Sequence, residues 1–132
     1  MIGVDTNILV RYFLQDDPNQ CRAVNRLLEE VETHTGTLFV NTTVLCELCW
    51  VLESVYGYTK THIAEIIEKM IRSPYFIIEN AEIAWEAMML YKKSGIDFAD
   101  LLIGKINHRF GCEYTVTFDK KAAKLSDFHL LS

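Results

Sequence analysis

The 132-residue sequence lacks the features of a membrane or secreted protein. No run approaches the roughly 18 uninterrupted apolar residues of a transmembrane helix. The first residues show neither the basic segment nor the long apolar run of a signal peptide. Only two prolines occur, and no internal repeat or low-complexity linker interrupts the chain. These absences predict a single domain over residues 1–132, located in the cytoplasm and without a membrane partner.

Cysteine is too sparse for a disulfide framework or a zinc site. In a reducing compartment Cys21, Cys46, Cys49 and Cys112 are expected as free thiols. Cys46 and Cys49 form a C-x-x-C pair, but their apolar neighbours are typical of a helix interior. A zinc ribbon needs a second such pair, and no histidines stand at zinc-ligand spacing. The pair is therefore predicted to serve packing.

Positive charge is also scarce. Lys plus Arg number 13 against 18 Asp plus Glu, which gives a net charge of −5. This balance argues against a general electrostatic nucleic-acid binder, because such domains are usually basic. It leaves open a nucleic-acid enzyme whose acidic residues hold a metal ion.

Apolar periodicity predicts an α/β fold in which short buried strands alternate with amphipathic helices. The alternation indicates three α/β/α layers around a central, mostly parallel sheet of four or five strands. The expected strands are 2–4, 37–40, 75–78, 114–118 and 128–131. The expected helices are 7–14, 17–32, 41–56, 59–72, 81–94, 97–110 and 120–125.

Acidic residues stand where two of these strands end and where two of the helices begin. Asp5 and Asp119 follow strands, while Glu47 and Asp100 lie in early helix turns. Ligands of open α/β sheets bind at the carboxyl ends of the strands, so these carboxylates are candidates for one shared site. The alternative is that Asp5, Asp100 and Asp119 cap helices. Capping does not explain Glu47: with mostly apolar neighbours, it lies either on a narrow exposed strip of its helix or close to a partner.

Electrostatic repulsion limits what such a cluster can do. Each carboxylate pair about 8 Å apart costs on the order of 2 kcal/mol at an effective dielectric constant of about 20. Four such groups would have to be partly protonated or bind a cation. Hard oxygen ligands suit Mg²⁺ or Mn²⁺ rather than zinc.

Four segments that contain these acids resemble, in order, the four motifs of PIN-domain proteins, and the short chain is most like the VapC-type toxins of that family. The segments are Val4-Asp5-Thr6-Asn7-Ile8-Leu9-Val10, Thr42-Thr43-Val44-Leu45-Cys46-Glu47-Leu48, Phe98-Ala99-Asp100-Leu101-Leu102-Ile103-Gly104 and Thr115-Val116-Thr117-Phe118-Asp119-Lys120. Family members often have Ala-Leu-Ile-Ala after the third acid, where this chain has Leu101-Leu102-Ile103-Gly104.

The resemblance implies an endoribonuclease that uses one or two Mg²⁺ or Mn²⁺ ions to cleave RNA phosphodiester bonds. It also implies a small antitoxin protein as partner, a homodimer and a higher toxin–antitoxin assembly. The implied catalytic metal ligands are Asp5, Glu47, Asp100 and Asp119. Supporting roles are expected for Thr6, Asn7 and Thr117, which could instead cap helices or turns, and for Asp97, which is either a helix cap or a group near the metal.

Basic and aromatic residues near these motifs are candidates for RNA contacts. Arg11, Lys105, Arg109 and Lys120 follow the proposed ligands, although an ordinary solvated surface would look the same. Tyr12, Phe13 and Trp50 have the side chains to stack on bases. Core packing is the simpler expectation for each of these aromatic residues.

Two other functions fit parts of the pattern. A non-catalytic PIN-like module that binds RNA or protein would typically lack one of the four acids, and all four are present. A phosphatase of the haloacid-dehalogenase type places its nucleophile after the first strand, as Asp5 is placed. That class needs a second Asp two residues later, where this chain has Asn7.

Overall fold

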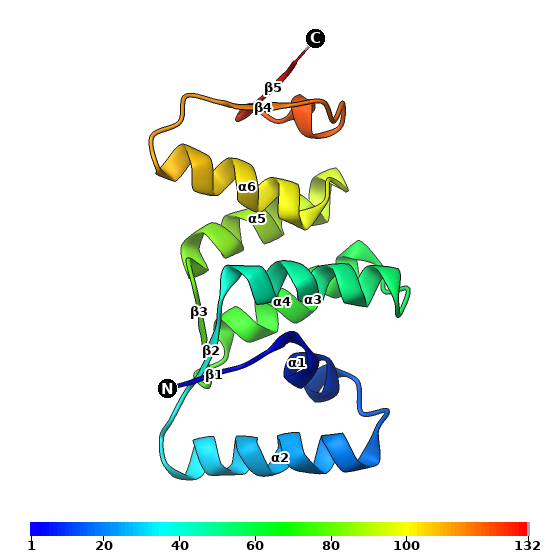
Figure 1. Cartoon of the computed structure of the whole chain (residues 1–132), viewed down its shortest axis with the longest axis vertical. Helices are drawn as coiled ribbons and strands as arrows, with labels where there is room; N and C mark the ends of the chain where they lie inside the picture. Colours follow the sequence, from blue (N-terminus) through cyan, green and yellow to red (C-terminus); the bar gives the residue numbers. More distant parts are fainter. Residues whose placement is uncertain (132) are drawn as a thin grey trace. The chain divides into compact units, whose positions relative to one another are not determined.

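Strands and helices alternate along the chain as predicted (Figure 1). The computed structural model describes residues 1–131. The elements are β1 (Ile2–Gly3), α1 (Thr6–Phe13), α2 (Pro18–Thr33), β2 (Leu38–Val40), α3 (Thr42–Ser54), α4 (Lys60–Arg72), β3 (Phe76–Ile78), α5 (Ala81–Ser94), α6 (Phe98–Arg109), β4 (Thr115–Thr117), the 3₁₀ helix η1 (Ala122–Lys124) and β5 (Phe128–Leu130). The last predicted helix is thus one short 3₁₀ turn, and the fifth strand is confirmed.

The chain divides into two structural units, which are described separately. The first comprises Met1–Ala81 and the second begins at Glu82. The expectation of a single domain stays a prediction. None of the helices within residues 1–131 is long and apolar enough to cross a membrane.

In the first unit, β1, β2 and β3 form a parallel sheet in that order. Leu38 pairs with Ile2 on one side and with Phe76 on the other. Parallel pairing brings the carboxyl ends of all three strands to the same edge. Asp5, Asn41 and Glu79 follow these ends, so the edge is lined by side chains with oxygen ligands.

Helix boundaries in the first unit come from local capping. The Asp17 carboxylate accepts hydrogen bonds of 3.1 Å from the backbone N–H groups of both Asn19 and Gln20, and Pro18 takes the first helical position of α2. The Asn41 side chain caps α3 through the N–H of Val44 at 2.8 Å. These caps satisfy backbone donors that the first turn of a helix leaves without partners.

The core of the first unit lies between amphipathic helices. α1 lies between α2 and α3 and packs against both (Figure 1). α3 and α4 pack on each other through fully buried side chains, among them Leu48, Leu52, Ile63 and Ile67. Cys49 is also buried there, and burial raises the pKa of its thiol. The predicted packing role of Cys49 is confirmed.

In the second unit, β4 and β5 pair in parallel, with Thr117 opposite Leu130. Phe128 of β5 packs its ring on Gly104 of α6, where an added Cβ would stand 2.5 Å from Phe128 Cε2. Tyr91 of α5 makes an edge-on ring contact with Phe98 of α6, with centroids 5.6 Å apart. The α/β class and the parallel strands are therefore confirmed. Strands β1, β2 and β3 are hydrogen-bonded in one sheet, and strands β4 and β5 are hydrogen-bonded in another.

Candidate metal and active site

Thr6 links two of the predicted acids in the first unit. Its backbone N–H donates to Oδ1 of Asp5 at 2.7 Å, so Asp5 caps α1. Its hydroxyl donates to Oε1 of Glu47 at 3.0 Å, although the two residues are 41 positions apart. Thr6 is only 3% exposed, whereas both carboxylates reach solvent. The buried hydroxyl thus holds one oxygen of Glu47 in place.

In the second unit, the charges of Asp97 and Asp119 act on Asp100. The pKa of Asp100 is raised, first by burial and then by the negative charges of Asp119 and Asp97. Repulsion of this kind is relieved by protonation or by a bound cation. Asp97 occupies the N-cap position of α6, but its side chain makes no capping hydrogen bond. The helix-cap explanation of Asp97 is therefore not supported by its geometry.

Asp119 is placed by a tight turn after β4. Its backbone N–H donates to the Thr117 hydroxyl at 3.0 Å. Its Oδ1 accepts from the N–H groups of Lys121 and Ala122 at 2.8 and 3.1 Å, which caps η1. Thr117 therefore orients the backbone that carries Asp119. Asp119 and Asp5 use Oδ1 for capping, and no hydrogen bond within residues 1–131 engages the other oxygen of either residue.

The acids provide hard oxygen donors, which Mg²⁺ and Mn²⁺ prefer. Each unit contributes part of the predicted set: Asp5 and Glu47 in the first, Asp100 and Asp119 in the second. Within residues 1–131, no three His, Cys, Asp or Glu side chains are close enough to share one metal ion. The donor chemistry of these acids fits a hard cation, and burial together with the charges of Asp119 and Asp97 raises the pKa of Asp100.

One carboxylate at the sheet edge was missed in the sequence. Glu79 follows β3, and its Oε1 accepts the backbone N–H of Thr42 at 2.8 Å. The Glu79 N–H in turn donates to the carbonyl of Val40 at 2.9 Å. Glu79 thus ties the start of α3 to the ends of β2 and β3. The rule that singled out Asp5, an acid directly after a strand, would also have found Glu79.

Three of the predicted basic RNA contacts are engaged by acidic side chains. Arg11 donates to Asp16 and Gln20, both at 2.6 Å, and its pKa is raised chiefly by a hydrogen bond to Tyr56. Lys105 pairs with Glu86 at 4.0 Å and Arg109 with Glu82 at 3.8 Å.

Lys120 and Asn7 differ from these residues. Lys120 is exposed and forms no ion pair within the described chain. The Asn7 side chain is exposed and forms no hydrogen bond among residues 1–131, so the backbone of Thr6 is what contacts Asp5. The RNA-binding roles of the four basic residues and the supporting role of Asn7 stay predictions.

Comparison with known proteins now defines the class. The PIN domain family matches residues 2–127, nearly the whole chain, and the chain belongs to this family. The resemblance seen in the four sequence motifs is therefore confirmed. A VapC ribonuclease of Aquifex aeolicus strain VF5 is 28% identical over 122 residues, which cover 92% of this chain and 90% of the relative. No solved structure matches the chain significantly.

Proposed function

We propose that this protein is a divalent-metal-dependent endoribonuclease that cleaves RNA phosphodiester bonds and acts as the toxin of a toxin–antitoxin pair. The observation that carries the proposal is that the chain belongs to the PIN domain family and has an acid in each of the four segments that resemble its motifs. The similarity to a VapC ribonuclease over nearly the full length of both proteins supports it. A phosphatase would need a second acid at the position of Asn7.

In this proposal Asp5, Glu47, Asp100 and Asp119 are the metal ligands. A bound Mg²⁺ or Mn²⁺ would lower the pKa of a water molecule and neutralise charge on the phosphate. The chain's own residues prepare this chemistry: the Thr6 hydroxyl orients Glu47, and the turn through Thr117 orients Asp119. Asp97 adds negative charge beside Asp100, which favours retention of a cation.

Partners and location follow from the same proposal. The substrate is RNA, the regulator is a small cognate antitoxin protein, and the toxin is a cytoplasmic homodimer in a larger toxin–antitoxin assembly. Exposed Lys120 beside Asp119 supplies positive charge for the RNA backbone. A net charge of −5 is compatible with RNA binding, because two bound Mg²⁺ ions would bring it close to −1.

Cleavage assays with purified protein test the enzymatic proposal. Single-stranded and structured RNAs are incubated with Mg²⁺, with Mn²⁺ or with EDTA, and Asp5→Asn and Asp100→Asn are assayed in parallel. We expect cleavage with either metal, none in EDTA, and loss of activity in both variants. Cleavage that persists in EDTA would contradict the metal-dependent mechanism. Metal-dependent RNA binding without cleavage would support the non-catalytic module instead.

Growth assays test the toxin assignment separately. Expression of the wild-type chain is expected to arrest growth, and Asp100→Asn is expected to abolish the arrest. Co-expression of the small protein encoded beside it should restore growth. Harmless expression of a chain that cleaves RNA in vitro would argue for a housekeeping nuclease.

A further inference from the structure

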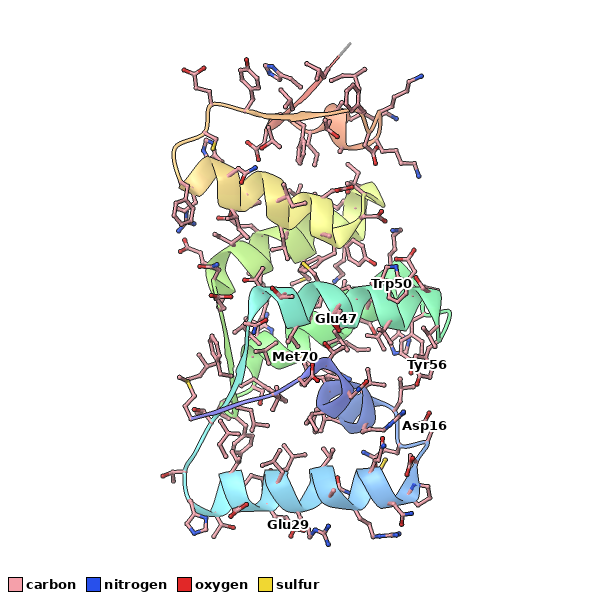
Figure 2. All side chains as sticks on the ribbon, viewed as in Figure 1. Asp16, Glu29, Glu47, Trp50, Tyr56 and Met70 are labelled. Carbon is pink, nitrogen blue, oxygen red and sulfur yellow. The ribbon has the colours of Figure 1, made fainter. Side chains whose placement is uncertain are left out.

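Trp50 is an exposed tryptophan on the same helix as a proposed metal ligand. It lies three positions after Glu47 on α3, and Figure 2 shows both residues on that helix. Residues three apart in a helix are surface neighbours, with Cβ atoms about 5–6 Å apart. Trp50 is 64% exposed, whereas Leu48 and Leu52 on the opposite side of α3 are fully buried. The core-packing expectation is therefore wrong for Trp50.

Several aromatic residues of the first unit have ring partners. Tyr12 contacts the rings of Phe13 and Phe76 edge-on, with centroid separations of 4.8 and 5.6 Å. Tyr58 stacks on His62 at 4.4 Å. Within the described residues no ring contact is found for Trp50, and its side chain is 64% exposed, so part of its indole is accessible to a ligand.

The surroundings of Trp50 are polar. Its exposed neighbours one helical turn away are Glu47, Glu53 and Ser54, and Glu53 pairs with Lys60 at 3.6 Å. Tryptophan is common at protein interfaces as well as on surfaces that bind single-stranded nucleic acid, but the core of a protein interface is depleted of charged residues. A single large ring among charged and polar side chains is better suited to a flat ligand with a polar periphery, such as a nucleobase.

We propose that Trp50 stacks on an unpaired base of the RNA next to the phosphate that is cleaved. This inference rests on the proposed ribonuclease function and names a contact that selects its substrate. Single-stranded RNA is commonly recognised by splayed bases that stack on aromatic side chains. Because every base has a π face, the contact favours unpaired over paired RNA without fixing one sequence. The separation from Glu47 places the stacked base close to the proposed metal.

Binding measured without metal tests this proposal independently of cleavage. Fluorescence anisotropy in EDTA compares wild type, Trp50→Ala and Trp50→Phe with a short single-stranded RNA. We expect Trp50→Ala to weaken binding about tenfold and Trp50→Phe to lose less than about threefold. Val55→Ala is the matched control, because Val55 is 62% exposed at the end of the same helix. It should bind like wild type.

An abasic RNA isolates the stacking contact. On an oligonucleotide without bases, wild type and Trp50→Ala should bind equally. In a Trp85→Phe background, Trp50 is the sole tryptophan, and its emission should be quenched by ordinary RNA but not by the abasic strand. In single-turnover cleavage, Trp50→Ala should raise the half-saturating RNA concentration about tenfold, as for binding. It should change the maximal cleavage rate less than about threefold.

Two results would overturn the stacking proposal. One is equal RNA affinity of wild type and Trp50→Ala. The other is weaker binding only together with a changed mass in sedimentation equilibrium, which would assign Trp50 to a protein interface. Failure of the ribonuclease proposal is distinct: wild type would bind RNA but cleave none with Mg²⁺ or Mn²⁺, while the Trp50 effect on binding persists.

Discussion

The hydroxyl of Thr6 donates a hydrogen bond of 3.0 Å to Oε1 of Glu47, which joins the first and second PIN motifs. Thr6 is buried at the start of α1, so its hydroxyl has a fixed position, whereas Glu47 projects from α3 into solvent. One oxygen of the carboxylate is thereby oriented, and no other hydrogen bond within residues 1–131 engages Glu47.

Thr6→Val tests this contact, because it removes the donor and keeps the shape of the side chain. We expect cleavage about tenfold slower, since hydrogen bonds to charged groups contribute about 1.5–3 kcal/mol. The maximal rate should fall while the half-saturating RNA concentration stays unchanged, as measured under single-turnover conditions. Thr6→Ser keeps the hydroxyl and should restore most of the rate. Equal rates for Thr6→Val and wild type would contradict the orienting role.

Asp100→Asn is expected to stabilise the metal-free protein at neutral pH. Burial and the charges of Asp119 and Asp97 raise the pKa of Asp100 in the folded state, so ionised Asp100 is less stable there than in the unfolded chain. Stability is therefore lost as pH rises from the usual Asp pKa through the raised value. The Tm of Asp100→Asn at pH 7 in EDTA should therefore exceed that of wild type.

The difference in Tm should vanish as pH falls below the usual Asp pKa of about 4, where residue Asp100 is protonated in both the folded and the unfolded chain. Added Mg²⁺ should raise the Tm of wild type and leave that of Asp100→Asn nearly unchanged, since binding to the folded state stabilises it. Thermal melts over this pH range provide the measurement. A lower Tm for the variant at pH 7 in EDTA would show that the carboxylate makes a favourable contact instead.

Gly104→Ala is expected to destabilise the protein. The new Cβ would stand 2.5 Å from Cε2 of Phe128, so the ring has to move from its place on α6. Overpacking of this kind costs about 1–3 kcal/mol, measured as the free energy of unfolding in urea. Gly3→Ala is the control, because no atom beyond Gly3 and its two chain neighbours lies within 4 Å of the Cβ position. Combined with Gly104→Ala, Phe128→Leu should recover part of the lost free energy of unfolding, because leucine is smaller and has no ring. Unchanged stability of Gly104→Ala would exclude close packing of Phe128 on residue 104.

Lys120→Ala should weaken RNA binding by removing one unpaired positive charge. For single-stranded RNA, loss of one phosphate contact reduces the slope of log K against log salt concentration by about 0.7. Lys93→Ala removes an exposed charge from α5 and serves as the matched control. Anisotropy titrations at several salt concentrations in EDTA give both slopes. Identical slopes for the two variants would show that Lys120 does not contact the RNA.

Local interactions explain why much of the fold was predictable. The start of α2 follows from Asp17 and Pro18, whose capping bonds reach only two or three residues along the chain. Helix ends at Gly57, Gly95 and Gly111 follow from positive φ angles of 68°, 68° and 96°, which glycine adopts without strain. The strand ends that precede Asp5 and Asp119 were predictable for the same reason, since apolar runs and turn residues are features of short sequence windows.

Contacts between distant segments were not predictable in this way. The sequence by itself determined the α/β class, the parallel strands and the four acids at element ends, because periodicity and capping depend on near neighbours. Only the tertiary structure showed that the Thr6 hydroxyl donates to Glu47 and that Glu79 accepts the N–H of Thr42, 37 positions away. Only the structure, too, showed that the ring of Phe128 lies against Gly104. The tertiary structure also showed that Trp50 is exposed to solvent. These relations depend on how helices and strands pack, and packing depends on all the side chains at an interface together.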